Sequence, residues 1–115
     1  MAVKIYHNPR CSKSRATLEL IEKQDIAPEI ILYLKNPPTA SELNDILQKL
    51  ALEPRQLMRK NEAEYKEMGM DVADLDRAAL IQGMVNNPKL IERPIVIAND
   101  QAIIGRPPEN VLTII

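Results

Sequence analysis

Aromatic residues are scarce in this chain of 115 residues, which contains three Tyr and neither Phe nor Trp. Without them, stacking platforms for single-stranded nucleic acid are not expected. An excess of charge of either sign is also missing, because 15 Lys and Arg stand against 16 Asp and Glu. No long-range field would attract nucleic acid or an anionic membrane. We therefore expect neither as a partner, and any anion site must be local.

Long apolar runs are absent as well. None approaches the ~18 residues of a membrane span, and residues 1–7, interrupted by Lys4, do not have the pattern of a secretory signal. The one Cys excludes an internal disulfide, and with the one His it cannot supply the ligand set of a structural zinc site. We expect a cytoplasmic protein with one domain, residues 1–115, and with no metal and no bound cofactor. A monomer is the expected state.

The first third of the chain predicts a strand, a helix and a second strand. Residues 2–6 alternate apolar and polar side chains. A helix is expected from residue 12 or 14 to about residue 24, with one face formed by Ala16, Leu20 and Ile21 together with Thr17. Residues 29–34 form an almost continuous apolar run of strand length. The expected structure of that run is a strand covered on both faces, as a parallel βαβ unit requires.

The rest of the chain predicts a helical block followed by a hairpin. Thr39 and Glu42 fit a capping box at the start of a helix that continues to about Leu50. Shorter helices are expected near residue 54, at 62–68, and from about 76 to 85. Two apolar segments flank Asn99 and Asp100 as in a β-hairpin, and a short helix from Pro107 ends the chain. This order, β-α-β, helical block, β-β-α, predicts an α/β thioredoxin-like (glutaredoxin-like) domain with a helical insertion at about 39–90.

Cys11 is the first candidate for chemistry. It lies in a polar, cationic loop, from His7 to Arg15, that leads into the first predicted helix. A helix N-terminus and nearby cations lower the pKa of a thiol and increase its thiolate fraction at neutral pH, and His7 would add to this effect if it were protonated. The alternative is that Cys11 is only a small buried apolar residue, and its polar neighbours argue against that interpretation.

Two spacings separate the candidate thiol chemistries. A dithiol oxidoreductase needs a second Cys in the pattern Cys-x-x-Cys, but Ser14 occupies that position, so a reducing thiol must come from another molecule. A low-molecular-weight phosphatase loop has the pattern Cys-x5-Arg, but the corresponding residue here is Thr17. The sequence therefore favours a nucleophilic Cys11 that depends on an external thiol.

Three arginines form the second candidate. Arg59 follows a pair of apolar residues, Arg93 precedes Pro94 at the start of a predicted strand, and Arg106 follows the end of another. If they converged, their guanidinium groups would bind a tetrahedral oxyanion through multidentate hydrogen bonds. Each one taken singly would be an ordinary surface residue or ion-pair partner. A cis peptide bond is predicted before Pro94, facing the nucleophile, as in other thioredoxin-like domains.

Together these segments resemble a known family. The blocks that carry the resemblance are residues 6–15, 32–38, 57–61 and 92–96 and the pair Arg106-Pro107, in this order over essentially the whole chain. They are similar to the glutaredoxin-dependent arsenate reductases. One departure is visible, because Arg10 and Lys13 stand near Cys11 where the best-known members have smaller residues.

The resemblance implies a mechanism based on a thiol. Cys11 would attack arsenate, and His7 would help to ionise it. Glutathione would be the co-substrate, and glutaredoxin would be the partner that removes the mixed thiol link as arsenite leaves. The oxyanion would be held by three arginines: Arg59, Arg93 and Arg106. Three further residues would support the site: Ser14, Arg15 and Pro94.

Two alternatives to an arsenate reductase stay open from the sequence. One is a thioredoxin-like regulatory module that binds RNA polymerase or another protein, because a related branch of the family contains such regulators. Ser14 argues against regulation through a Cys-x-x-Cys disulfide. The other is a monothiol, glutathione-dependent reductase of a different substrate, and such an enzyme would not need three arginines that face an oxyanion.

Overall fold

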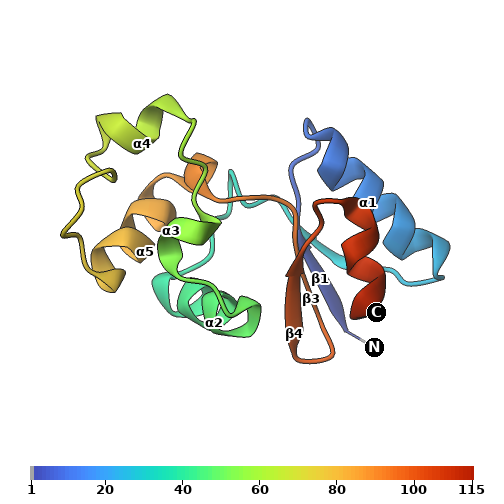
Figure 1. Cartoon of the computed structure of the whole chain (residues 1–115). Coiled ribbons are helices and arrows are strands. Elements are labelled where there is room, and N and C mark those ends of the chain that lie inside the picture. The colour runs from blue at the N-terminus through green and yellow to red at the C-terminus, as the bar shows by residue number, and fades with distance from the viewer. Residues whose placement is uncertain (1) are drawn as a thin grey trace. The chain divides into compact units, whose positions relative to one another are not determined.

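The computed structural model describes residues 2–115 of the chain (Figure 1). Its four strands are β1 (Val3–Tyr6), β2 (Glu29–Ile31), β3 (Ile95–Ala98) and β4 (Gln101–Ile104). They form one sheet in the order β2-β1-β3-β4, in which β1 is parallel to β2 and antiparallel to β3. β3 and β4 form the predicted hairpin, and its turn residues Asn99 and Asp100 both have a positive φ.

One face of the sheet is covered by two helices, α1 (Ser12–Lys23) and the 3₁₀ helix η2 (Pro108–Thr113), which pack against each other (Figure 1). Of the face predicted for α1, Thr17 and Ile21 are buried, whereas Ala16 and Leu20 are half-buried. The core between the helices and the sheet consists of branched aliphatic side chains and one Ala: Val3, Ile5, Ile21, Val96, Ala98, Val111 and Ile114. This packing fixes the start of α1, and therefore Cys11, against the sheet.

The prediction for residues 29–34 is wrong in part. The strand is present, but it ends at Ile31, and the chain then turns, with the N–H groups of Lys35 and Asn36 donating to the carbonyl of Leu32. β2 is also an edge strand with 46% of the Ile30 side chain exposed, so it is not covered on both faces. Its apolar composition resembled that of a central strand, and only the pairing of the whole sheet sets its position at the edge.

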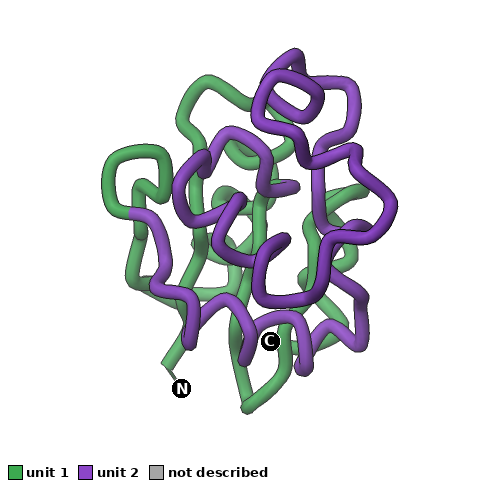
Figure 2. Tube along the Cα trace, turned by 90° about the vertical axis from the view of Figure 1, so that its left-hand side faces the viewer, with its two compact units in different colours: residues 1–36, 93–115 green, residues 37–92 purple. Residues whose placement is uncertain are grey.

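The contacts divide the chain into two compact units (Figure 2). The sheet unit comprises residues up to 36 together with 93–115, and the helical unit comprises residues 37–92. The predicted helical insertion, 39–90, corresponds to the helical unit, whereas the assignment of both units to one domain stays a prediction. The helical unit contains four α-helices and one 3₁₀ helix: α2 (Ala40–Leu50), α3 (Pro54–Leu57), α4 (Ala63–Glu67), α5 (Arg77–Asn86) and η1 (Pro88–Leu90).

Local signals explain where several of these helices begin and end. The predicted capping box at the start of α2 is confirmed, with Thr39 and Glu42 each accepting a hydrogen bond from the other's backbone N–H. Gly69 follows α4 with a φ of 69°, as expected of a glycine that ends a helix. Within residues 2–115, no helix is both long enough and apolar enough to span a membrane.

Arg55 fixes the loop between α4 and α5, a role that the sequence did not indicate. Its Nη1 donates to the Tyr65 hydroxyl and to the Met70 carbonyl, each at 2.6 Å, and its Nη2 donates to the Val72 carbonyl. Because a guanidinium group has several donors in one plane, a single side chain can hold two points of the loop against Tyr65 of α4. The helical unit therefore has an internal polar anchor.

Candidate active site

Cys11 occupies the N-cap of α1, where the sequence placed it. Its backbone N–H donates to the carbonyl of Asn8 at 3.0 Å, and its own carbonyl accepts from Arg15 N–H at 3.0 Å. The loop that precedes the helix is thus folded back on itself. The thiol is free and partly exposed, in contrast to the alternative of a buried structural cysteine.

The pKa of the Cys11 thiol lies below its ordinary value. Burial alone would raise it, but four favourable interactions together outweigh that effect. The backbone N–H groups of Ser14 and Lys13 point to the sulfur, and the positive charges of Arg93 and Arg106 act on it. All four stabilise the thiolate, so the helix start and the two arginines make Cys11 a better nucleophile at neutral pH.

Arg106 approaches the thiol directly, with its Nη1 3.9 Å from Cys11 Sγ. Arg93 lies just before β3, and the predicted cis peptide bond between Arg93 and Pro94 is present. A second cis bond, before Pro107, was not predicted. The structure therefore brings two of the three predicted arginines to the nucleophile, both within the sheet unit.

Close packing joins these arginines to the helix that carries Cys11. The hydroxyl of Thr17, a buried residue of α1, is within hydrogen-bond distance of the carbonyls of Lys13 and Gly105, at 2.8 and 3.3 Å. Gly105 N–H donates to the Pro94 carbonyl at 2.9 Å. A Cβ on Gly105 would lie 2.4 Å from Thr17 Oγ1 and 2.9 Å from Pro94 Cγ, so only glycine fits. Arg106, the next residue, is held in place by this contact.

Ser14 stands where a dithiol enzyme would have its second Cys, and it is completely buried. Its Oγ accepts from Asn8 N–H at 3.0 Å and lies 2.6 Å from Nδ1 of His7. The serine therefore links the helix to the segment after β1 through a buried hydrogen bond to His7 and a partly buried one from Asn8. Arg15 supports the same loop from outside, because its Nη1 donates to the Pro9 carbonyl at 2.9 Å.

His7 does not contribute the positive charge that was considered from the sequence. Burial of the ring, reinforced by the charge of Arg15 and opposed by Glu22, lowers the pKa of His7 below its usual value. The imidazole is therefore neutral at neutral pH. Its short contact is to Ser14, with His7 Nδ1 2.6 Å from Ser14 Oγ. A catalytic role for His7 stays a prediction.

Arg59, the third predicted arginine, belongs to the helical unit. Its backbone N–H donates to the Leu90 carbonyl at 2.7 Å, and its Nη2 pairs with Glu62 Oε1 at 2.7 Å. Lys89 joins the same cluster, with its Nζ 3.5 Å from Glu62 and 3.2 Å from Glu64. The convergence of Arg59 with the other two arginines stays a prediction. That its guanidinium holds a carboxylate was not apparent from the sequence.

Comparison with known proteins places this arrangement in a family. The model of the ArsC family matches residues 6–114. The chain belongs to the ArsC family. It is 55% identical to the uncharacterized protein YfgD of Escherichia coli, over 98% of this chain and 96% of that one. It is 52% identical to a protein of Neisseria meningitidis named arsenate reductase, over 95% of this chain and 94% of that one. A solved structure, an arsenate reductase from Vibrio cholerae, superposes with a TM-score of 0.96 at 52% identity, over 100% of this chain and 98% of that one.

Membership of the ArsC family confirms the predicted thioredoxin-like α/β fold.

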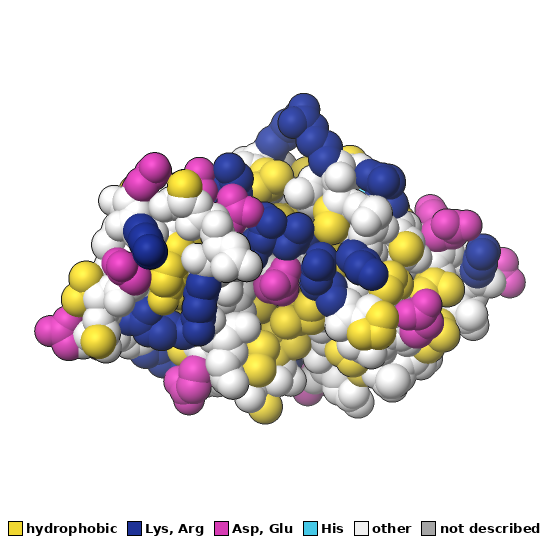
Figure 3. Space-filling model, turned by 45° about the horizontal axis from the view of Figure 1, so that its top comes forward, with side chains coloured by type: hydrophobic (Ala, Val, Ile, Leu, Met, Phe, Trp, Pro, Cys, Tyr) yellow, Lys and Arg dark blue, Asp and Glu magenta, His cyan; other side chains and the backbone are white. Residues whose placement is uncertain are grey.

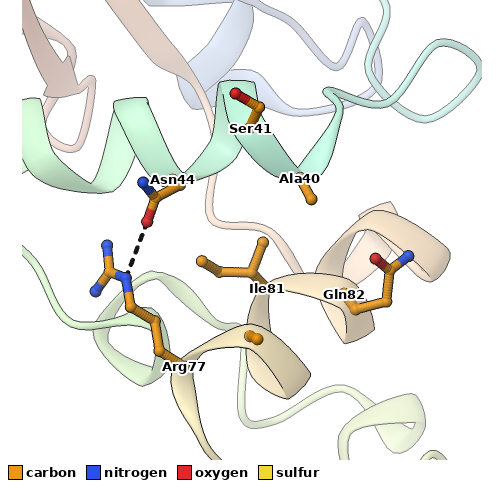
Figure 4. Close-up of a pocket in the computed structure, with 7 residues that line it drawn as sticks. Ala40, Ser41, Asn44, Arg77, Ile81 and Gln82 are labelled. Atoms are coloured by element: carbon orange, nitrogen blue, oxygen red, sulfur yellow. Dashed lines mark hydrogen bonds between the residues drawn. The ribbon is translucent and has the colours of Figure 1, made fainter.

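The helical unit of this ArsC chain has a hollow of its own, between α2 and the start of α5, with a volume of about 460 Å³. Figure 4 shows Arg77 at its edge, donating from Nε to Asn44 Oδ1 at 2.9 Å. Neither Cys nor His lines it, and Arg77 also pairs with Glu53 at 3.8 Å. This hollow therefore offers neither a thiol nor an imidazole to a ligand.

Proposed function

We propose that this ArsC-family protein is an arsenate reductase that works through Cys11 and takes its electrons from glutathione and glutaredoxin. The observation that carries the proposal is the environment of the thiol, whose pKa is lowered although burial opposes ionisation, and which has Arg106 Nη1 3.9 Å from its sulfur. A nucleophilic thiolate beside a guanidinium suits attack on an oxyanion. Relatives named arsenate reductase at 49–52% identity support the same substrate.

The proposed reaction begins with the Cys11 thiolate attacking arsenic and displacing a hydroxyl of arsenate as water, which leaves a thiol-arsenate adduct. Glutathione then adds to arsenic and displaces a second water. A glutaredoxin thiolate attacks the glutathione sulfur, and the electron pair of the arsenic–sulfur bond reduces arsenic. Addition of one water releases arsenite and restores the Cys11 thiol. The net reaction converts arsenate, one glutathione thiol and one glutaredoxin thiol into arsenite, a mixed disulfide and water.

The need for an outside thiol follows from the chain itself. Cys11 is its one cysteine, so no internal disulfide can take up the oxidising equivalents. Ser14 is buried in hydrogen bonds and cannot replace the second thiol. Since both proposed thiol sources are maintained in reducing compartments, we infer a cytoplasmic location for the reaction.

Charge stabilisation is assigned to the arginines. In this proposal Arg93 and Arg106 bind the oxygens of the adduct, where negative charge develops, and hold the oxyanion while the thiol attacks. Arg59 is the third ligand, and it would share its guanidinium between the substrate and Glu62. Loss of a preorganised donor at such a position typically costs about 10²–10³ in kcat.

The test is arsenate-dependent oxidation of NADPH in an assay coupled to glutathione, glutaredoxin and glutathione reductase. Wild type should turn over, Cys11→Ser should be inactive, and Arg106→Gln should lose about two orders of magnitude, in line with the loss of an oxyanion donor. Lys4→Gln, an exposed lysine on β1, is the matched control for loss of a positive charge. No turnover by folded wild type, with all coupling enzymes active, would reject the proposal in favour of a regulator or a different thiol substrate.

A further inference from the structure

The sheet unit contains a hollow beside the nucleophile loop that the proposed reaction has not yet used. It has a volume of about 270 Å³. One wall is residues 7–10, the segment directly before Cys11, and the other is the turn after β2, with Leu32, Leu34 and Lys35. The two walls are tied together, because His7 N–H donates to the Ile31 carbonyl at 2.8 Å. The hollow is thus held open by the backbone, at the end of the sheet that lies near Cys11.

Its lining selects for a particular chemistry. Leu32, Leu34 and Pro9 give it mainly apolar surface, while Arg10 and Lys35 supply positive charge, and no acidic residue lines it. His7, which is neutral at neutral pH, also lines it. Such a site fits the carboxylate end of a small ligand, since the cations would pair with the acid group. Figure 3 shows Lys and Arg side chains, in dark blue, exposed on the face turned forward from the top of Figure 1.

Size restricts the ligand further. Pockets that enclose a whole drug-sized molecule run from about 300 to 1,000 Å³, so this hollow would take one end of a short peptide rather than all of it. The remainder of a bound peptide would extend past Arg10, and the next residue along the chain is Cys11. A peptide held in this hollow by a terminal carboxylate would therefore lie beside the segment that carries the nucleophile.

The hollow and the oxyanion ligands are separate groups of residues. Arg106, and with it Arg93, acts on the Cys11 sulfur, whereas neither lines the hollow. Two anions are therefore accommodated by different cations, one at the sulfur and one at Arg10 and Lys35. A reaction that joins an oxyanion, a protein thiol and a carboxylate-bearing thiol needs this separation, because one shared anion site would make the two substrates compete.

We propose that this hollow binds a terminal carboxylate of the peptide thiol that reduces the Cys11 adduct, through Arg10 and Lys35. The inference rests on the proposed function for the identity of that thiol, glutathione, and it adds the place where glutathione docks. Arg10 and Lys35 act only in binding, so their loss weakens the use of glutathione and leaves the attack of Cys11 on arsenate intact.

Equilibrium binding tests the site without any turnover. S-methylglutathione, which has no free thiol, is titrated into ¹⁵N-labelled wild type, Arg10→Gln, Lys35→Gln and the control Lys4→Gln. In wild type and the control, the amide shifts should concentrate at residues 7–10 and 32–35. Each exposed ion pair is worth up to about 1 kcal/mol, so each variant should bind about two- to fivefold more weakly. The dimethyl ester of S-methylglutathione, which lacks the carboxylates, should bind all four proteins equally weakly.

Steady-state kinetics provide the second readout. Arg10→Gln and Lys35→Gln should raise the KM for glutathione by a similar factor and leave the KM for arsenate unchanged. An increase confined to the KM for glutaredoxin would overturn the inference, because the hollow would then be a protein-docking surface.

The outcomes separate the two proposals. If wild type reduces arsenate but the variants bind S-methylglutathione as wild type does, the docking site is rejected and the proposed function stands. If wild type shows no arsenate turnover but binds S-methylglutathione through Arg10 and Lys35, the function is rejected and the peptide site stands. Amide shifts that map to other residues would reject the site irrespective of turnover.

Discussion

The sheet unit and the helical unit each pack a glycine against a side chain, with opposite consequences. A Cβ on Gly105 would meet Thr17 Oγ1 at 2.4 Å, and one on Gly83 would meet Met70 Sδ at 2.2 Å. Thr17 is buried and β-branched, and its hydroxyl bonds to a carbonyl of its own helix, so it cannot move. Met70 is flexible and can turn aside. The neighbour of Gly105 is therefore rigid, whereas the neighbour of Gly83 is adjustable.

Charged side chains show the same contrast. In the sheet unit, Arg106 is directed at the Cys11 sulfur and lowers the pKa of the thiol. In the helical unit, Arg59 lies 2.7 Å from the carboxylate of Glu62, which also contacts Lys89. An arginine beside a thiol promotes chemistry, but an arginine beside a carboxylate is partly neutralised. The comparison shows that the effect of an arginine depends on the group beside its guanidinium, and the presence of an arginine alone does not predict that effect.

The largest effect on stability should come from Gly105, with Gly83 as its counterpart in the helical unit. Gly105→Ala forces Thr17 and Pro94 apart and should lower the free energy of unfolding by about 1–3 kcal/mol or more. Gly83→Ala requires only a rotation of Met70 and adds a better helix former to α5, so the unfolding free energy should stay the same or rise by up to about 1 kcal/mol. Urea unfolding followed by circular dichroism measures both. Equal destabilisation by the two substitutions would remove the contrast in rigidity.

The next effect concerns the buried serine of the nucleophile loop. Ser14→Ala leaves Asn8 N–H without its acceptor and removes the contact to His7, so the free energy of unfolding should fall by about 1–3 kcal/mol. Ser12→Ala, at an exposed position in the same helical turn, should change it by less than about 0.5 kcal/mol. Chemical denaturation of both variants decides the point. A small effect at Ser14 would mean that the loop is not held by these bonds.

The pH dependence of the rate at which Cys11 is alkylated tests the effect assigned to the charge of Arg106. Iodoacetamide reacts with the thiolate, so its rate rises as the pH passes the pKa of Cys11. Arg106→Gln removes a positive charge and should move the profile to higher pH, towards that of an ordinary thiol. Lys13→Gln should leave it in place, since Lys13 acts through its backbone N–H. An unshifted profile in Arg106→Gln would contradict the assigned cause.

The same shift links ionisation of the thiol to stability. Because the pKa of Cys11 is lower in the folded protein than in the unfolded chain, its ionisation stabilises the fold at pH values above the ordinary thiol pKa. This contribution is lost as the pH falls through the lower, folded pKa. The stability difference between wild type and Cys11→Ser should therefore depend on pH in that window.

The smallest effect should come from the ion pair of Arg59. If Arg59 holds the oxyanion as proposed, Glu62 competes with the oxyanion for the guanidinium group. Glu62→Gln should then strengthen oxyanion binding by about fivefold, the upper end of the range for one surface ion pair. Glu64→Gln is the matched control, because Glu64 contacts Lys89. Sulfate inhibition of arsenate turnover reports the affinity. Identical inhibition in both variants would show that Glu62 does not limit access to Arg59.

Much of the fold was predictable because its signals are local. The capping box at Thr39, the turn at Asn99 and Asp100, and Cys11 at a helix start each depend on a few neighbouring residues. The end of β2 at Ile31 was missed, since the edge position of a strand depends on pairing across the whole sheet.

The candidate site was predictable to a similar extent and for the same reason. The residues around Cys11 follow one another in the sequence, and Arg106 was suggested by its position at the end of a strand. The neutral state of His7 depends on burial by distant segments, and the three acceptors of Arg55 lie 10–17 residues further along the chain. No sequence pattern indicates either one. The partner of Arg59, although only three residues away, was not distinguished from other surface acids.

The burial of Ser14 also bears on how this chain can evolve. Replacement of the one residue Ser14 by cysteine would complete a Cys-x-x-Cys pattern with Cys11. The new thiol, however, would be a weak hydrogen-bonding group in a fully enclosed position that now satisfies Asn8 and His7. Lineages would therefore cross from one thiol chemistry to the other only with accompanying changes at the end of β1.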